Sequence, residues 1–219
     1  MTLAIFDLDN TLLAGDSDHL WGEFLVERGI VDARAYREAN DRFYRDYQAG
    51  NLNIHEYLDF ALDLLRRHPP EQLEQWRREF LDTRIEPIIL PAGRDLLDRH
   101  RRRGDHLMII TATNDFITAP IAERLEVGTL LATLVERRDG HYTGKATGVP
   151  CYREGKVRRL GQWLEETGES LSGGWFYSDS HNDIPLLERV DNPVAVDPDP
   201  LLEETARKRG WHIMSLREE

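Results

Sequence analysis

The feature that most constrains the fold of this sequence is an alternation of short apolar runs with amphipathic segments, which begins after Pro87 and Pro91. Strands of a buried sheet form short apolar runs, whereas helices repeat apolar residues at helical spacing. Such alternation predicts an α/β fold, a doubly wound parallel sheet with helices on both faces. We expect strands at residues 106–111, 129–135, 175–178 and 194–196, a hairpin arm at 142–145, and helices at 94–103, 116–125, 154–166, 184–189 and 201–209.

A different pattern separates the first strand from this alternation. Residues 3–6 form an apolar run that predicts a strand buried on both faces. Across residues 16–84, apolar and aromatic side chains recur at helical spacing, and no strand is predicted. Because this block follows the first strand of the sheet, we expect a small all-helical cap, residues 16–85, inserted into a core formed by residues 1–15 and 86–219.

The composition narrows the class of protein and its partners. The 219 residues suit one large domain or one domain with an insertion, at roughly 100 to 200 residues per domain. The formal net charge of -12 would repel nucleic acid and anionic lipid, so we expect neither as a partner. The one cysteine, Cys151, excludes an intrachain disulfide and a cysteine-based metal site. Without a recognisable signal peptide or an apolar run of about 18 residues, we expect a soluble cytoplasmic protein, a monomer or a homodimer.

Polar residues gather where three of the predicted strands end. The motifs are residues 7–12 after the first strand, 111–114 after the second and 179–183 after the fourth. Because the carboxyl ends of parallel strands meet at one edge of a sheet, Asp7, Asp179 and Asp183 would repel one another unless a cation lay among them. Oxygen ligands of this kind favour Mg²⁺. Each acid alone is equally typical of a turn or a helix N-cap, but their shared position favours the metal site.

These motifs resemble those of the haloacid dehalogenase superfamily of phosphatases. The resemblance rests on Asp-Leu-Asp-Asn-Thr after an apolar strand, a Thr after the second strand, a downstream Lys and Ser-Asp-Ser-His-Asn-Asp. The helical insertion between the first two motifs is similar to the cap of the phosphoserine phosphatase-like branch. The resemblance covers nearly the whole chain and implies a Rossmann-like core and a magnesium-dependent phosphomonoester hydrolase.

The resemblance also implies a phosphoryl transfer in two steps. Asp7 would attack the phosphorus atom and form an aspartyl-phosphate, which water then hydrolyses. Asp9 would protonate the leaving oxygen and then deprotonate the attacking water. The implied metal ligands are the carboxylates of Asp7 and Asp179 and the backbone carbonyl of Asp9, with Asn182 and Asp183 acting mainly through waters. The implied phosphate ligands are the Thr111 hydroxyl, the backbone N–H groups of Asn10 and Ala112, and Lys156, which would tie the Asp7 carboxylate to the phosphate.

Two positions depart from the motifs of the family. Ser178 stands where the fourth motif usually has Gly, and a small residue should fit there. Ala112 and Thr113 stand where phosphoserine phosphatases tend to have two glycines, which puts phosphoserine itself in question as the substrate. Thr113 is an alternative phosphate-binding hydroxyl, but Thr111 directly follows the apolar run and is the better candidate.

Other functions can be weighed on the same residues. Dehalogenases of the superfamily need neither a metal nor an acid, so Asp9, Asp179 and Asp183 argue against dehalogenation. A phosphomutase would pass the aspartyl-phosphate to a sugar hydroxyl, but the sequence lacks the cap signatures of the sugar mutases. A non-catalytic binding module would commonly have lost the nucleophile or the acid, and this sequence has both.

The substrate depends on the cap, where the sequence is less explicit. In phosphoserine phosphatases the acidic position that corresponds to Asp16 holds the substrate amine. Asp16 and Asp18 are therefore candidate ligands of a substrate ammonium, although either would also serve as the N-cap of a cap helix. Trp21 and Phe24 would line the cleft or form the buried face of that helix. The run over residues 9–19 resembles a bacterial group that includes histidinol-phosphate phosphatases, so we expect a small phosphorylated metabolite, histidinol phosphate first and phosphoserine second.

Overall fold

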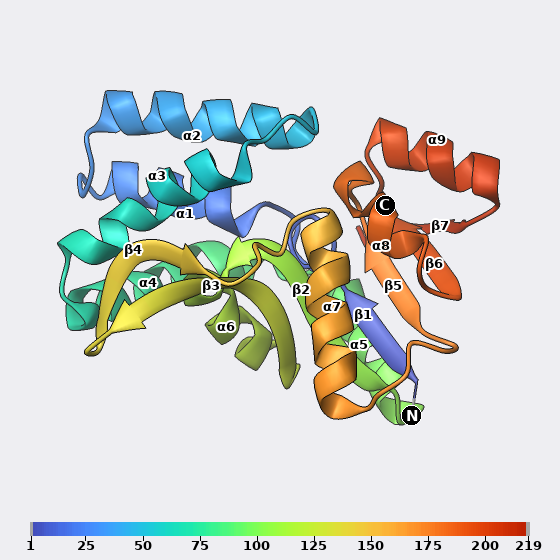
Figure 1. The fold of residues 1–219 in the computed structure, drawn as a ribbon. Helices are drawn as coiled ribbons and strands as arrows, with labels where there is room; N and C mark the ends of the chain where they lie inside the picture. Colours follow the sequence, from blue (N-terminus) through green and yellow to red (C-terminus); the bar gives the residue numbers. More distant parts are fainter. Residues whose placement is uncertain (1, 218–219) are drawn as a thin grey trace.

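The structure, a computed structural model, describes residues 2–217 and has one central sheet with helices on both faces (Figure 1). In this part of the chain the sheet has seven strands in the order β4-β3-β2-β1-β5-β6-β7. All neighbours pair in parallel except β4, which is antiparallel to β3. The strands are β1 (Leu3–Phe6), β2 (His106–Asn114), β3 (Thr129–Arg138), β4 (His141–Thr147), β5 (Trp175–Ser178), β6 (Asn192–Val196) and β7 (His212–Met214).

The two faces of the sheet carry separate apolar cores because side chains alternate along each strand. Leu3 and Ile5 of β1 pack with the helices that follow β4, β5 and β6, whereas Ala4 and Phe6 pack with the two helices that flank β2 in the sequence. The helices are α1 (Ser17–Glu27), α2 (Ala33–Gln48), α3 (Ile54–Arg67), α4 (Pro70–Phe80), α5 (Pro91–Arg102), α6 (Asp115–Arg124), α7 (Glu154–Thr167), α8 (Ile184–Leu187) and α9 (Pro200–Arg209). Over residues 2–217, no helix combines the length and the apolar character that crossing a membrane requires.

The predicted α/β class with a mostly parallel sheet is confirmed, and the differences are one additional strand and shifts at the ends of elements. The strand β7 was not predicted, because three residues are too few to show a pattern. They form a strand because β6 offers an edge to pair with. The helix expected over residues 184–189 ends at Leu187. Short elements depend on their neighbours more than on their own sequence, which explains both differences.

The helices α1 to α4 lie together over the carboxyl ends of the strands (Figure 1), and we refer to this group as the cap. No strand occurs within residues 17–88; an isolated antiparallel bridge joins Leu13 to Ile89, on either side of the cap. Trp21 and Phe24 stack on each other with ring centroids 5.5 Å apart and are buried in the apolar core. Of the two interpretations of this pair, the structure therefore supports the buried helix face. The division of the chain at residue 16 and residue 85 stays a prediction.

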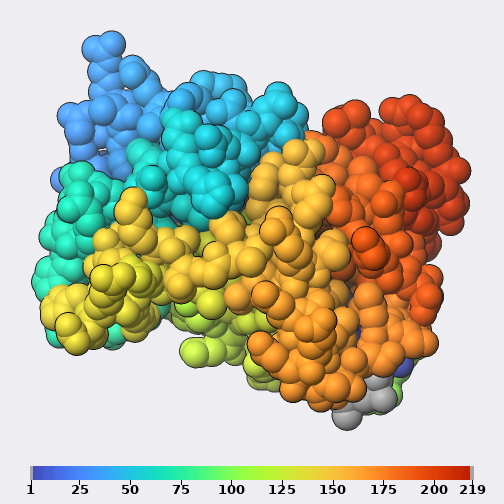
Figure 2. Space-filling model, in the orientation of Figure 1, coloured from blue at the N-terminus to red at the C-terminus, as the bar shows by residue number. Residues whose placement is uncertain are grey.

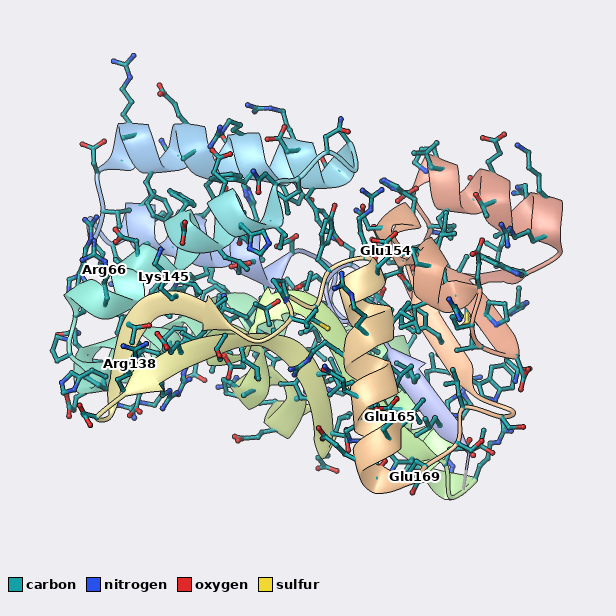
Figure 3. The ribbon with its side chains drawn as sticks, in the orientation of Figure 1. Arg66, Arg138, Lys145, Glu154, Glu165 and Glu169 are labelled. Carbon is teal, nitrogen blue, oxygen red and sulfur yellow. The ribbon has the colours of Figure 1, made fainter. Side chains whose placement is uncertain are left out.

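The hairpin of β3 and β4 extends beyond the end of β2 and supports the cap from below (Figure 2). Lys145 of β4 forms an ion pair with Asp59 of α3 at 2.6 Å, and Arg66 of α3 lies over the same strand (Figure 3). A Cβ atom at Gly144 would come within 2.8 Å of the Arg66 side chain, so this strand needs a glycine there. One side of the cap therefore packs against the hairpin of the core.

Candidate active site

The first motif begins where β1 ends, and hydrogen bonds connect it to the fourth motif. The backbone N–H of Asp7 donates to the carbonyl of Tyr177 in β5 at 2.9 Å, which continues the sheet for one more residue. The Thr11 hydroxyl donates to Asp179 Oδ1 at 3.2 Å and accepts from the Asp179 backbone N–H at 3.1 Å. Two strand ends that the sequence separates widely are therefore held in register at one edge of the sheet.

Lys156 joins two of the predicted acids. Its ammonium donates to Asp7 Oδ1 at 2.8 Å and to Asp183 Oδ2 at 2.7 Å, and all three side chains are buried. Ser178, the residue in place of the usual glycine, donates its hydroxyl to Asp183 Oδ2 at 2.7 Å. Burial raises the pKa of Asp7 to about 7, although the Lys156 charge opposes this shift. Burial would lower the pKa of Lys156, but the two carboxylates hold it above its ordinary value.

The acids at this edge outnumber the one lysine among them. Burial, together with the charges of Asp7 and Asp183, raises the pKa of Asp179 well above its ordinary value. A divalent cation among these carboxylates would remove that repulsion. Within residues 2–217, no three His, Cys, Asp or Glu side chains are grouped tightly enough to hold a metal by themselves. Mg²⁺ needs only one or two carboxylates with waters and other oxygens, so Asp7, Asp179 and the Asp9 carbonyl fit it.

Asp9 is fixed in position through both of its carboxylate oxygens. Oδ1 accepts from the backbone N–H of Ser17 at 2.7 Å, and Oδ2 accepts from the Thr113 hydroxyl at 2.8 Å. Burial, with the charge of Asp16, raises the pKa of Asp9 to about 6. A carboxyl group with a pKa near the working pH can both donate and accept a proton, as a general acid and base must.

The second motif lies beside Asp9, at the end of β2. The backbone N–H of Thr113 donates to the Thr111 hydroxyl oxygen at 3.2 Å, and the Thr133 hydroxyl donates to the Ala112 carbonyl at 2.9 Å. Because the Thr113 hydroxyl already binds Asp9, Thr111 remains the better candidate for the phosphate. The backbone N–H of Asn10 donates to the Gly15 carbonyl at 3.0 Å. This N–H group is used inside the loop, which counts against the phosphate contact predicted for Asn10.

A cavity lies between these strand ends and the cap. Its floor contains Asp7, Asp9 and residues 111–113, so the structure brings the predicted nucleophile, acid and second motif together at one opening. Its upper wall belongs to the cap and is largely aromatic. The rings in that wall are His19, Phe43, Tyr44, Tyr47 and Tyr57.

Asp16 and Asp18 both face this cavity, but their contacts differ. Asp16 is the N-cap of α1, and its Oδ1 accepts from the backbone N–H groups of Asp18 and His19 at 3.0 and 2.8 Å. Asp18 accepts a hydrogen bond from the Tyr57 hydroxyl. Burial raises the pKa of each carboxyl to about 7. Across residues 2–217, neither forms an ion pair with a lysine or arginine, so both interpretations of Asp16 stand together.

The comparisons with known proteins agree with this geometry. A model of the haloacid dehalogenase-like hydrolase family matches residues 4–188. The chain belongs to this family. A relative named histidinol-phosphatase from Neisseria meningitidis is 45% identical over 98% of this chain and 99% of its own length. A relative named phosphoserine phosphatase SerB1 from Mycobacterium tuberculosis is 31% identical over 98% of this chain and 70% of its own length. The resemblance inferred from the motifs is confirmed, and the chain is a phosphatase of this family.

Solved structures show the same fold. A protein of unknown function from Bordetella pertussis superposes with a TM-score of 0.93 at 43% identity, over 99% of this chain and 100% of its own. A substrate-bound phosphoserine phosphatase superposes with a TM-score of 0.73 at 19% identity, over 100% of this chain and 94% of its own. At that identity the second match shows the family fold and no more.

The structure shows contacts of several residues around the motifs of the family that were not predicted. Asn182 was expected to act on the metal through water, but its amide donates to the Tyr47 carbonyl of the cap at 3.1 Å and accepts from the Tyr152 hydroxyl at 3.1 Å. Tyr44 and Tyr57 belong to the block predicted to be helical, and both line the cavity. Their helical spacing is the same for a buried face and for a cavity wall, so spacing could not separate the two.

Proposed function

We propose that this phosphatase hydrolyses a small phosphomonoester with Mg²⁺, through an aspartyl-phosphate on Asp7. The observation that carries the proposal is the pair of Asp7 and Asp9 in one cavity floor, with the Lys156 ammonium bound to both Asp7 and Asp183. Lys156 holds one oxygen of Asp7, which leaves the other oxygen of that carboxylate to attack. Such fixed charges are needed for phosphoryl transfer, in which positioning and electrostatic stabilisation dominate.

The steps follow from these contacts. An Asp7 oxygen forms a bond to phosphorus, the bond from phosphorus to the leaving oxygen breaks, and Asp9 gives that oxygen a proton. Water then attacks the phosphorus of the aspartyl-phosphate, Asp9 takes up its proton, and Asp7 is released with inorganic phosphate. Lys156 offsets charge on the phosphate oxygens throughout. Bound Mg²⁺, held by Asp7, Asp179 and the Asp9 carbonyl, would supply further charge neutralisation.

Histidinol phosphate is the substrate that we propose. It carries an amine and an imidazole, and the cap wall offers Asp16 and Asp18 without a lysine or arginine partner in the described chain, beside aromatic rings. Buried carboxylates of this kind are stabilised by a ligand that brings positive charge. The relative named histidinol-phosphatase, at 45% identity over nearly the full length, supports the same choice. Phosphoserine, an amine ester without the ring, is the second candidate, on the relative named for it.

The test is hydrolysis of histidinol phosphate, phosphoserine and p-nitrophenyl phosphate by the purified protein after treatment with EDTA. Without a metal all three rates should vanish, Mg²⁺ should restore them, and Ca²⁺ should inhibit because its longer and looser coordination would misplace the nucleophile. Histidinol phosphate should have the highest kcat/KM. Full activity in EDTA would contradict the metal, and a higher kcat/KM for phosphoserine would replace the proposed substrate.

A further inference from the structure

The cap meets the core at a second place, the C-terminal end of α2. Here the Arg153 guanidinium donates to the Gly50 carbonyl at 3.1 Å, and the Asn182 amide donates to the Tyr47 carbonyl at 3.1 Å. The rings of Tyr47 and Tyr152 lie 6.0 Å apart. We refer to residues 47–52 as the cap tip; half of this segment is exposed and none of it is fully buried. Segments of that kind open most easily in a folded protein.

Arg153 adopts a backbone conformation that only glycine adopts readily. Its φ is 51° and its ψ is -120°, immediately before α7 begins. A side chain in this region is strained, and such strain persists where the surrounding structure or a function requires it. A glycine would relieve the strain but would have no group to reach the cap tip. The Arg153 side chain, which is kept despite the strain of this backbone conformation, makes the hydrogen bond to Gly50.

The cap tip is also shaped to approach the fourth motif closely. Gly50 has a φ of +69°, and a Cβ atom there would lie 2.7 Å from Nε2 of His181. The His181 ring is held in place from the other side, since its Nδ1 is 2.7 Å from Asp199 Oδ2. The approach therefore requires glycine for two reasons, the backbone conformation and the space.

Both core residues at this contact belong to the catalytic loops. Arg153 lies three positions before Lys156, and Asn182 directly precedes Asp183, the two residues whose side chains meet beside Asp7. On the cap side, Tyr47 lines the cavity in which the phosphate ester would bind. A movement of the cap tip would therefore change both the cavity wall and the support of the Asn182 amide.

We propose that Arg153 is a positioning residue that, together with Asn182, holds the cap tip closed against the catalytic loops while the substrate is bound. The hairpin side of the cap serves as the fixed base, and the cap tip is the part that opens to admit substrate. The choice of substrate in the test rests on the proposed function, but the closing contact itself does not. If only the closed form binds substrate, weakening the contact between Arg153 and Gly50 lowers the fraction of molecules that are closed. KM then rises in proportion to that loss, and kcat stays nearly unchanged.

The test compares Arg153→Gly with the wild-type protein in two measurements. The backbone N–H groups of residues 49–51 donate to carbonyls in the last turn of α2. Their hydrogen exchange should become about tenfold faster, since a hydrogen bond from a charged group is lost. KM for histidinol phosphate should rise about tenfold, with kcat within about twofold. The Tm should stay equal or rise, because glycine removes the strained conformation. Loss of a purely structural contact would instead lower Tm and leave the ratio of KM to kcat unchanged.

Matched variants separate the effect of the Arg153 guanidinium from the effect of backbone strain and from the effect of losing a surface charge. Arg153→Ala keeps the strained backbone conformation and loses the contact with Gly50. Its hydrogen exchange and its KM should match those of Arg153→Gly, and its Tm should be lower than that of Arg153→Gly. Gly50→Ala should loosen the cap tip from the opposite side. Asp139→Gly relieves a positive φ of 50° in an exposed turn, and Arg45→Ala removes an exposed arginine from α2; both should leave exchange at residues 49–51 and KM unchanged.

Unchanged exchange at residues 49–51 in both Arg153 variants would overturn the closing contact, whichever ester the enzyme prefers. Faster exchange without hydrolysis of histidinol phosphate would keep the closing contact and reject the proposed substrate. Exchange that rises over the whole chain in Arg153→Gly would show a general loss of stability and would overturn the positioning function.

Discussion

The two ends of the active-site cavity deal with negative charge in different ways. At the floor, Asp7 accepts a hydrogen bond from the Lys156 ammonium, which also binds Asp183 behind it, and Asp9 accepts a hydrogen bond on each oxygen. At the cap wall, Asp16 accepts hydrogen bonds from two backbone N–H groups, and Asp18 accepts one from the Tyr57 hydroxyl. Among residues 2–217, no lysine or arginine forms an ion pair with either carboxylate. The floor is thus built for a phosphate group that every substrate shares, whereas the cap wall leaves charge for the ligand to balance.

The largest effect should come from the floor. Asp7→Asn should lower the rate roughly 10⁴-fold or more for every ester, because the amide is nearly the same shape but a poor nucleophile. The fold should persist, since removing a buried charge also removes its desolvation cost. Steady-state rates and a thermal unfolding curve check this expectation. A residual rate near that of the wild-type protein would mean that Asp7 is not the nucleophile.

Asp9→Asn should have a smaller effect that depends on the leaving group. The loss should be about 10² to 10⁴-fold for an alkyl ester such as histidinol phosphate, whose leaving oxygen needs a proton. It should be clearly less for p-nitrophenyl phosphate, whose phenolate leaves without one. Measuring kcat for both esters gives the contrast. Equal losses would remove Asp9 from acid catalysis and leave it a structural contact of Ser17 and Thr113.

Changes at the cap wall should affect selectivity rather than the chemical step. Asp16→Asn or Asp18→Asn should lower kcat/KM about ten- to a hundredfold for an amine-bearing ester and leave p-nitrophenyl phosphate nearly unchanged. Asparagine also caps helices well, so the stability of Asp16→Asn should barely move. Tyr57→Phe is the matched control, since it removes the hydroxyl next to Asp18 and keeps the ring. No selectivity at either acid would return both to capping and packing.

The smallest effect concerns stability and pH. Burial raises the pKa of Asp18 from its ordinary value of 3.8 to about 7. The folded protein therefore holds this proton more tightly than the unfolded chain, and the stability that Asp18 adds at low pH is lost as the pH rises through about 7. Asp18→Asn should reduce the fall in unfolding free energy between about pH 5 and about pH 8 by roughly 1 to 2 kcal/mol. Urea unfolding in EDTA measures the unfolding free energy at each pH. The same pH dependence for the wild-type protein and Asp18→Asn would contradict the raised pKa of Asp18.

Much of the core followed from local pattern. Short apolar runs gave β1, β2, β3, β5 and β6 because parallel strands are buried on both faces, and the acids that follow them had to meet at one edge. The pairing of Lys156 with Asp7 was expected from the motifs of the family, and the structure places these two side chains 2.8 Å apart. The contact of Lys156 with Asp183 was not expected, because the sequence gives no direction for a side chain.

The sequence by itself determined the fold class and the floor of the cavity, because strand ends and their motifs are local features that the sheet brings together in a fixed order. Only the tertiary structure decided the cap wall. Whether Tyr44, Tyr57 and Asn182 face a core, a cavity or another element depends on how the helices pack, and helical periodicity is the same in each case. The contact of Arg153 with Gly50 joins positions 103 residues apart and depends on a backbone conformation that no residue type announces.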